Sequence, residues 1–308
     1  MIMNKTDKPT AVFLAGPTAS GKTDLAVELA ETGRFEIISV DSALVYRGMN
    51  IGTAKPDKQT LEKAPHRLID ICEPTEAYSA ARFRQDALVA MQEITAAGKI
   101  PLLAGGTMLY FKALQYGLSA LPESDPLIRQ KLQSQLDKYG SVWLYEQLQK
   151  VDPVICERLH PNDPQRIMRA LEVYEISGEP LSQLQAGNND KALPYQLNKF
   201  VISPYERPEL HERIARRFHL MMELGFEDEV RNLMSIEGMH ENLPSMRSVG
   251  YRQMLMYFRG EYNRDEMIER GIIATRQLAK RQFTWLRADQ EYIWLTRNPA
   301  EQILESIT

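Results

Sequence analysis

The chain has 308 residues, of which 44% are hydrophobic and 25% are charged, a composition typical of a globular protein. It contains no apolar run of about 18 residues that could span a membrane. Residues 1–10 are polar and lack the apolar core of a signal peptide. Two cysteines, Cys72 and Cys156, are too few for a disulfide framework and form no C-x-x-C pair. We therefore expect a cytoplasmic protein without a membrane segment.

The net charge of −4 conceals an uneven distribution. Residues 247–287 carry nine basic and four acidic side chains, a local excess of five positive charges. Such a face can bind a phosphate backbone whatever the total charge of the protein. A solvated helical surface would explain the same charges. Nucleic acid therefore stays a candidate partner of this segment.

The first predicted elements surround a glycine loop. Residues 11–15 predict a short buried strand, and residues 24–31 predict a helix with one apolar face. Between them, residues 16–23 match G-x-x-x-x-G-K-[ST], a loop whose backbone N–H groups hold phosphate at a helix N-terminus. We expect Lys22 to reach phosphate oxygens and the Thr23 hydroxyl to bind Mg²⁺. The residues of this phosphate loop are Gly16, Pro17, Thr18, Ala19, Ser20, Gly21, Lys22 and Thr23.

Further strands alternate with helices along the chain. The predicted strands are 36–40, 67–71, 100–104 and 199–203, with a weaker one at 292–295. The clearest helix between them is 79–97, which Gly98 ends. This alternation predicts an α/β fold, a P-loop NTPase-like parallel sheet core flanked by helices.

Two segments follow strands of this sheet and are expected to meet the phosphate loop. Asp41 comes directly after the second strand, and Gly105-Gly106-Thr107 follow the strand at 100–104. Parallel sheets bind ligands at the carboxyl ends of their strands. We therefore expect all three segments to face one crevice.

Residues from about 120 to 197 interrupt the alternation with helical patterns only. The alternation continues after this segment with the strand at 199–203 and a long helix at 208–224, which Gly225 ends. We expect an all-helical insertion domain between two parts of one core. The predicted division is 1–119 for the first part of the core, 120–197 for the helical insertion, and 198–308 for the second part with basic C-terminal helices.

Seven motifs make the chain resemble a known family. They occupy residues 16–23, 40–47, 50–56, 105–110, 163–172, 248–253 and 280–287. Together, over residues 10 to 290, they resemble bacterial tRNA dimethylallyltransferases, also called tRNA isopentenyltransferases. The resemblance implies transfer of a dimethylallyl group from dimethylallyl diphosphate to the exocyclic amine of the adenosine at tRNA position 37. It also implies a kinase-like, nucleotide-binding type of loop that holds a prenyl diphosphate, with Mg²⁺ assisting diphosphate departure.

The resemblance assigns three catalytic residues. Asp41 would accept the proton of the acceptor amine, although an aspartate at this place can also cap a helix. Thr107 would lie near the reacting diphosphate, although it can equally be a turn residue. Arg217 would hold the diphosphate, with Arg216 as a competitor for that role and a solvated helix face as the alternative for both.

The tRNA contacts implied by the resemblance centre on the anticodon stem-loop. Arg166 and Arg169 share one helix face and could hold backbone phosphates. Trp285 or Phe283 could stack on a base, although such aromatics more often belong to a core. Extrusion of the target base is expected. The implied contacts are Asp41, Ser42, Ala43, Leu44, Thr107, Arg129, Gln165, Arg166, Ile167, Met168, Arg169, Arg247, Ser248, Val249, Gly250, Tyr251, Arg252, Lys280, Arg281, Gln282, Phe283, Thr284, Trp285, Leu286 and Arg287.

Other functions remain open at this level. The same fold could prenylate free adenine nucleotides, but the basic segments would then be superfluous. A small-molecule kinase would use ATP at the same loop. A non-catalytic RNA-binding module would need neither the intact loop nor Asp41. A monomer is the expected state.

Overall fold

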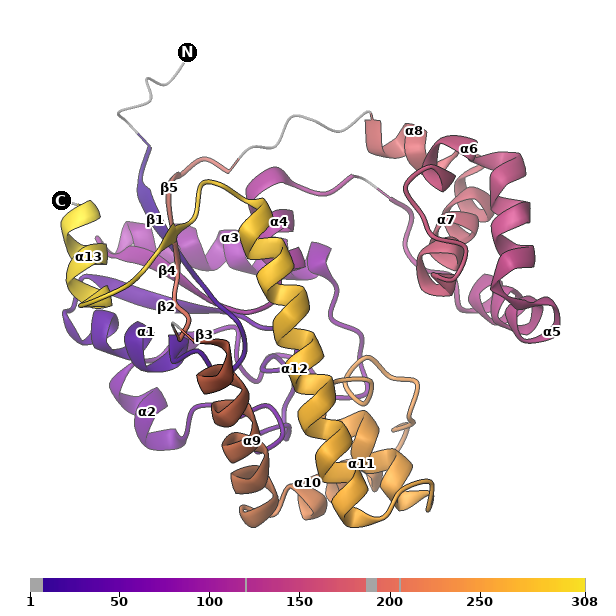
Figure 1. Ribbon diagram of the computed structural model, residues 1–308. Helices are drawn as coiled ribbons and strands as arrows, with labels where there is room; N and C mark the ends of the chain where they lie inside the picture. Colours follow the sequence, from indigo (N-terminus) through magenta and orange to yellow (C-terminus); the bar gives the residue numbers. More distant parts are fainter. Residues whose placement is uncertain (1–7, 120, 187–192, 205, 308) are drawn as a thin grey trace. The chain divides into compact units, whose positions relative to one another are not determined.

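The computed structural model describes residues 8–119, 121–186, 193–204 and 206–307. It divides into two compact units, one made of residues 1–115 and 194–308 and the other of residues 116–193. The first unit contains a parallel sheet of six strands in the order β3-β2-β4-β1-β5-β6 (Figure 1). The strands are β1 Thr10–Ala15, β2 Phe35–Val40, β3 His66–Arg67, β4 Ile100–Gly105, β5 Gln196–Val201 and β6 Ile293–Trp294. The predicted parallel α/β sheet is confirmed.

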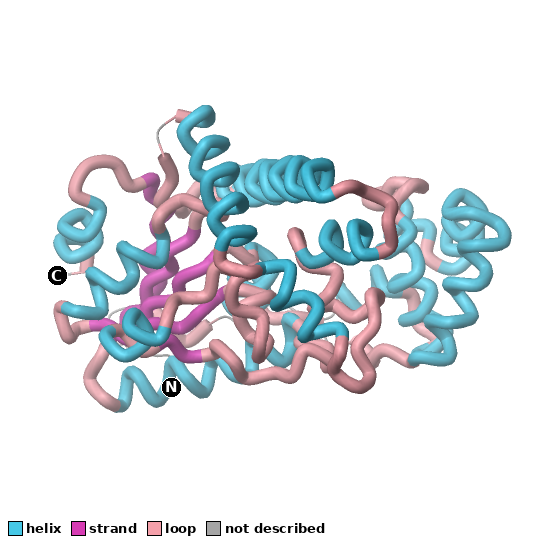
Figure 2. Tube along the Cα trace, turned by 90° about the horizontal axis from the view of Figure 1, so that it is seen from below, coloured by secondary structure: helices cyan, strands magenta, loops and turns pink. Residues whose placement is uncertain are grey.

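The two innermost strands, β1 and β4, are almost entirely apolar because helices cover the sheet. Val12, Leu14 and Leu102 are fully buried in a cluster that also includes Leu25 and Leu29 of α1. This pattern is typical of parallel strands that are covered on both faces. Figure 2 shows the strands enclosed among helices. The helices of this unit are α1 Lys22–Glu31, α2 Lys58–Lys63, α3 Ala80–Ala96, α4 Met108–Tyr116, α9 Arg207–Glu223, α10 Phe226–Met234, α11 Tyr251–Phe258, α12 Arg264–Ala288 and α13 Pro299–Ser306.

Local sequence signals set the ends of these helices. The Ser79 hydroxyl accepts a hydrogen bond from the Arg82 N–H and caps α3. Asn263 and Glu266 form a reciprocal capping box at the start of α12. Gly98 and Gly225 have φ angles of 74° and 93°, and each follows the end of its helix. The predicted helices at 79–97 and 208–224 are therefore confirmed, within a residue or two at their ends.

The predicted strand at 67–71 is wrong beyond its first residue. β3 covers only His66–Arg67, because Leu68 and Asp70 have φ angles of 63° and 54°. These left-handed conformations turn the chain away from the sheet. The Asp70 N–H bonds to the Leu44 carbonyl instead, and its carboxylate pairs with Lys55. Tertiary contacts thus overrule an apolar strand pattern.

The second unit is helical throughout its described part. Its helices are α5 Pro126–Val151, α6 Pro153–Cys156, α7 Pro164–Ser177 and α8 Leu181–Ala186. It has its own core, in which Leu144, Leu148 and Val173 are fully buried. The expected boundary at 197 is too late, because Gln196 and Leu197 of β5 already pair with Thr10 and Ala11 of β1. Within the described ranges, no helix combines the length and apolar character needed to cross a membrane.

Candidate active site

A cavity of about 510 Å³ lies at the carboxyl ends of the central strands. Thr18, Asp41 and Thr107 all line it, and each follows the end of a different strand. The remaining walls come from the start of α4, from α9, from α12 and from the segments 52–53 and 244–251. The expected meeting of the phosphate loop with the two strand ends is therefore present, at the edge where open parallel sheets bind ligands.

The phosphate loop has the backbone that its glycines predict. Gly21 has a φ of 91°, and a Cβ atom on Gly16 would lie 2.3 Å from the Ile202 carbonyl oxygen. Lys22 folds back over the loop and donates a 2.6 Å hydrogen bond to the Pro17 carbonyl. Burial lowers the pKa of the Lys22 ammonium to about 7, and the opposing attraction of Asp41 is weaker. An anion bound beside Lys22 would raise this pKa again.

Arg217 and Arg216 occupy different environments. The Arg217 guanidinium lines the cavity and donates a 2.6 Å hydrogen bond to the Thr18 hydroxyl. Burial lowers the pKa of Arg217, and the negative charge of Asp41 opposes that shift. The Arg216 side chain is 72% exposed and pairs with Glu212 at 3.0 Å. Of the two arginines, only Arg217 can contact a ligand held in the cavity.

Asp41 and Thr107 fix the same turn. Asp41 Oδ1 accepts hydrogen bonds from the N–H groups of Ala43 at 2.8 Å and Leu44 at 3.4 Å. Its Oδ2 accepts none from residues that the structure describes. The Thr107 hydroxyl accepts a 3.0 Å hydrogen bond from the Ser42 N–H. No helix begins at Asp41, so the helix-capping alternative does not apply. One carboxylate oxygen of Asp41 holds a turn instead, and the second is available to a substrate.

Gln282 of α12 lies inside the site, where the sequence pattern suggested a tRNA contact. Its Oε1 accepts a 2.9 Å hydrogen bond from the Thr18 N–H, and its Nε2 donates at 2.8 Å to the Gly106 carbonyl. A Cβ atom on Gly106 would lie 2.5 Å from the amide nitrogen of Gln282, so a larger residue there would displace the end of the Gln282 side chain. The available signal was a polar side chain on the buried stripe of α12, between Ala279 and Leu286.

The two aromatic candidates for base stacking also differ. Trp285 lines the cavity, is 43% exposed, and has the Lys112 ammonium 5.6 Å from its ring centroid. Phe283 stacks on Trp294 with their ring planes 3° apart and contacts the guanidinium of Arg287. Trp285 therefore has a free ring face toward the cavity, whereas Phe283 already has an aromatic partner.

The basic C-terminal segment is only partly available to a ligand. Arg247 and Arg281 line the cavity together with Ser248 and Val249. Arg259 pairs with two glutamates at the surface. Leu286 is fully buried and Tyr251 directs its hydroxyl to Glu229. The side chain of Leu286 therefore cannot contact RNA, contrary to its inclusion among the expected contacts. RNA contacts by exposed side chains of this segment, among them Arg252, Lys280, Thr284 and Arg287, remain predictions. Gly250 is the N-cap residue that precedes α11.

The arginines of the helical unit surround a buried acid. Glu172 is 1% exposed and accepts hydrogen bonds from Arg129 at 3.0 Å, Arg169 at 2.7 Å and Ser124 at 2.6 Å. Burial alone would raise the pKa of Glu172, but these donors together hold it below its usual value. Arg166 is 69% exposed, and its one ion pair with a described residue is to Asp163 at 3.3 Å. Arg166 is thus the better placed of the predicted phosphate contacts.

Two neighbours of Arg166 in the expected tRNA-binding stretch are partly or wholly internal. Ile167 is fully buried and Met168 packs against the same core, whereas Gln165 is exposed. The side chain of Ile167 cannot contact RNA, because it fills the core of this unit. The stretch therefore presents Gln165 and Arg166 outward.

The chain is similar to a known protein family and to several solved structures. The family model described as IPP transferase matches residues 44–289. The tRNA isopentenylpyrophosphate transferase of Bacillus halodurans is 34% identical with a TM-score of 0.69, the match covering 97% of this chain and 96% of that one. The tRNA delta(2)-isopentenylpyrophosphate transferase of Staphylococcus epidermidis is 33% identical with a TM-score of 0.67, over 97% and 98% of the two chains. A eukaryotic dimethylallyltransferase acting on tRNA is 27% identical with a TM-score of 0.79, over 97% of this chain and 78% of that one.

Proposed function

The chain belongs to the IPP transferase family, and we propose that the residues around its cavity catalyse the transfer of a dimethylallyl group from dimethylallyl diphosphate to the exocyclic amine of adenosine 37 in tRNA. As a member of this family it is a tRNA dimethylallyltransferase, an enzyme that prenylates tRNA. One observation supports the residue assignments. Thr18 and Arg217, which we assign to anion binding, line the same cavity as the carboxylate of Asp41.

The diphosphate binds on the phosphate-loop side. Backbone N–H groups at the start of α1 point toward an anion, and the helix dipole adds to their attraction. Lys22 and Arg217 contribute two cationic side chains there, and both are half-buried, so their charges are less screened than on an open surface. Negative charge grows on the leaving oxygens as the allylic carbon–oxygen bond breaks, so fixed positive groups stabilise the transition state more than the ground state.

Thr23 is the residue that would hold Mg²⁺. It is exposed in the first turn of α1, and its hydroxyl has no hydrogen-bond partner among the described residues. Those residues contain no group of three or more histidine, cysteine or acidic side chains that could hold a metal. The site therefore fits an ion bound mainly by phosphate oxygens and water, with one protein hydroxyl, as Mg²⁺ commonly is. Such an ion would neutralise charge on the departing diphosphate.

Asp41 receives the proton from the acceptor amine. The lone pair of an aryl amine is delocalised into the ring, so the amine becomes nucleophilic enough only if its proton can leave as the carbon–nitrogen bond forms. Asp41 Oδ1 is engaged with the turn, which orients the carboxylate and leaves Oδ2 for the proton. Thr107 holds the same turn through Ser42. In the overall step, the carbon–nitrogen bond forms, the allylic carbon–oxygen bond breaks, diphosphate leaves, and the amine proton passes to Asp41.

The anticodon stem-loop approaches from the side of Trp285. Arg247 and Arg281 line the same cavity, so a base that leaves its stack and enters it would meet an exposed indole ring and two guanidinium groups. Since all these groups belong to one chain, a monomer is sufficient for transfer. Action on tRNA favours a cytoplasmic location.

One labelling experiment tests this proposal. The protein is incubated with radiolabelled dimethylallyl diphosphate and, in parallel reactions, with a tRNA carrying adenosine at position 37, the same tRNA with guanosine there, or AMP. Label should enter only the adenosine tRNA. Label in AMP would favour the free-nucleotide activity, and label in the guanosine tRNA would contradict the target atom. A parallel reaction with γ-labelled ATP tests for kinase activity.

A further inference from the structure

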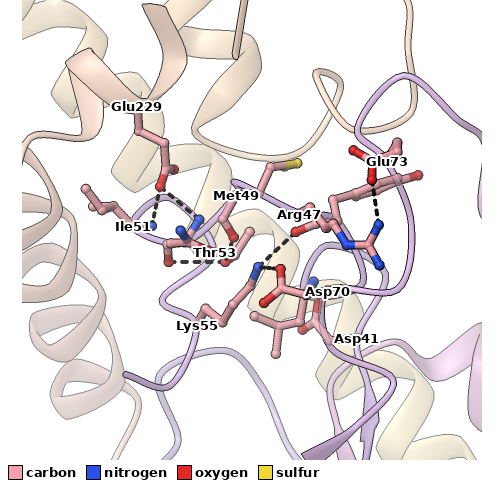
Figure 3. Close-up of polar contacts among 12 residues, drawn as sticks. Asp41, Arg47, Met49, Ile51, Thr53, Lys55, Asp70, Glu73 and Glu229 are labelled. Carbon is pink, nitrogen blue, oxygen red and sulfur yellow. Dashed lines mark hydrogen bonds and ion pairs between the residues drawn. The ribbon is translucent and has the colours of Figure 1, made fainter. Parts of the chain in front are cut away.

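Glu229, in the first turn of α10, holds a loop that lies beside the cavity. Its Oε2 accepts hydrogen bonds from the N–H groups of Asn50 at 2.8 Å and Ile51 at 2.6 Å. Its Oε1 accepts from the Gly52 N–H at 3.0 Å and from the Tyr251 hydroxyl at 2.7 Å. Figure 3 shows the carboxylate of Glu229 directed at the turn that contains Ile51. Three consecutive N–H groups thus enclose one carboxylate, the geometry of a backbone anion nest.

The held segment, residues 49–55, is closed at its other end by Lys55. The Lys55 ammonium donates to the Tyr46 carbonyl at 2.8 Å and pairs with Asp70, and its side chain is 4% exposed (Figure 3). The Thr53 hydroxyl donates to the Met49 carbonyl at 2.7 Å. These hydrogen bonds fix the conformation of the segment, and Glu229 attaches the segment to α10.

Packing at Gly52 shows how closely the segment lies against its support. A Cβ atom on Gly52 would lie 2.2 Å from the Phe226 ring and 2.6 Å from the Tyr251 ring. Both rings are fully buried. Gly52 and Thr53 in turn line the cavity that Asp41 lines. A displacement of this segment would therefore move a wall of the reaction cavity.

We infer that Glu229 is a positioning residue for the acceptor side of the reaction. It acts through Gly52 and Thr53, which face the same cavity as the carboxylate of Asp41. It makes no hydrogen bond to the phosphate loop or to Arg217 among the described residues. The inference rests on the proposed function, because it assumes that the acceptor amine meets Asp41. Loss of Glu229 should then slow prenyl transfer while donor binding is retained.

A carboxylate is required at this position because four donors converge on it. A carboxylate only accepts hydrogen bonds, whereas one end of a glutamine amide is itself a donor. In Glu229→Gln, either the pair from Asn50 and Ile51 or the pair from Gly52 and Tyr251 would face an NH₂ group. The substitution preserves shape and volume, so it loosens the segment without leaving a cavity.

The test compares Glu229→Gln with Glu227→Gln, a matched variant two positions earlier in the same helical turn. Glu227 forms an ion pair with Arg231 at 2.7 Å and has no other polar partner among the described residues. Single-turnover transfer to saturating tRNA is measured together with the affinity for dimethylallyl diphosphate and the melting temperature. Glu229→Gln should slow transfer by about 10- to 100-fold, since small misplacements of reacting groups cost factors of this size. Its donor affinity should stay within twofold of the wild-type value, and Glu227→Gln should match the wild type throughout.

A second measurement distinguishes positioning from general destabilisation. Hydrogen exchange at the amides of Asn50, Ile51 and Gly52 should accelerate in Glu229→Gln, and exchange in β1 and β4 should not change. Tyr251→Phe, which removes one donor of the four, should give an intermediate transfer rate and tests the inference even if Glu229→Gln does not fold. Wild-type transfer rates in both variants, or a loss of donor affinity as large as the loss of rate, would overturn it. Failure of the wild-type protein itself to prenylate tRNA would contradict the proposed function instead.

Discussion

Gln282 accepts a 2.9 Å hydrogen bond from the backbone N–H of Thr18, and thereby joins α12 to the phosphate loop. Its amide nitrogen donates in the opposite direction to the carbonyl that follows β4. One neutral side chain thus satisfies a donor and an acceptor from two loops that are far apart in sequence. This bridge fixes the position of the phosphate loop relative to the turn that contains Thr107.

Gln282→Leu should weaken donor binding and lower the free energy of unfolding by about 1–3 kcal/mol, because it leaves a half-buried N–H and a buried carbonyl without their present partner. Donor affinity by calorimetry and chemical denaturation measure the two effects. Gln277→Leu is the matched control, since Gln277 is exposed on the same helix. Equal stability and equal affinity in the two variants would show that the bridge has no such role.

The sequence allowed prediction of those parts of the fold whose signals are local. The glycine loop, the strand ends that follow it and the helix ends at Gly98 and Gly225 were predicted because periodicity, glycine and capping residues act over a few positions. The strand predicted at 67–71 was wrong because Asp70 is fixed by Lys55, which is distant in sequence. A pattern of apolar residues carries no information about such a partner.

The site was less predictable than the fold. Gln282 and Glu229 were missed as internal residues because their hydrogen-bond partners are backbone atoms of loops far along the chain. Backbone atoms have no sequence signature. Arg129 and Arg169 looked like phosphate contacts because the buried acid that binds them, Glu172, could be recognised only from its position in the folded core.

Asp41→Asn should reduce transfer by about 10²- to 10⁴-fold, the usual cost of losing a positioned base. The asparagine carbonyl can still accept the hydrogen bond from the Ala43 N–H, so the turn should survive. Single-turnover transfer with both substrates saturating is the measurement. Affinity for tRNA should stay within a few-fold of the wild-type value, and transfer at near wild-type speed would contradict the assignment of Asp41 as the base.

Donor binding should depend on pH through Lys22. Its pKa of about 7 in the free protein results from burial, and a bound diphosphate would raise it. Above about pH 7, binding must therefore take up a proton, and donor affinity should fall by up to tenfold per pH unit. Below pH 7 the dependence on Lys22 should vanish. Calorimetry in buffers of different ionisation enthalpy measures the proton uptake.

Lys22→Met is the control for that prediction. It should bind the donor weakly and without this proton uptake, which separates Lys22 from the ionisation of the diphosphate itself. Stability provides a second check, since the unfolded chain binds the Lys22 proton more tightly than the folded one. Wild-type stability should therefore rise with pH from about 7 to 10.5, and the variant should lack this contribution. An unchanged pH profile in Lys22→Met would refute the assignment.

Trp285→Ala and Phe283→Ala should affect different properties. Removal of the exposed Trp285 ring should weaken binding of an anticodon stem-loop by about 1–3 kcal/mol, the value of one base stacked on an aromatic side chain. Removal of Phe283 takes away the partner of Trp294 and should lower the melting temperature more than it lowers RNA affinity. Filter binding and thermal unfolding of both variants measure these effects, and the reverse pattern would assign the stack to Phe283.

Arg166→Ala and Arg169→Ala separate an RNA contact from an internal one. Arg166 is exposed with a single surface ion pair, so its loss should leave stability unchanged and reduce the salt dependence of tRNA binding by about one unit of slope. Arg169 binds the buried carboxylate of Glu172, so its loss should lower the free energy of unfolding by about 1–3 kcal/mol. Transfer to a saturating anticodon stem-loop should persist in Arg166→Ala, because the diphosphate site is unaltered. An unchanged salt slope in Arg166→Ala would mean that this arginine does not contact the RNA backbone, and equal stability of the two variants would mean that Glu172 does not depend on Arg169.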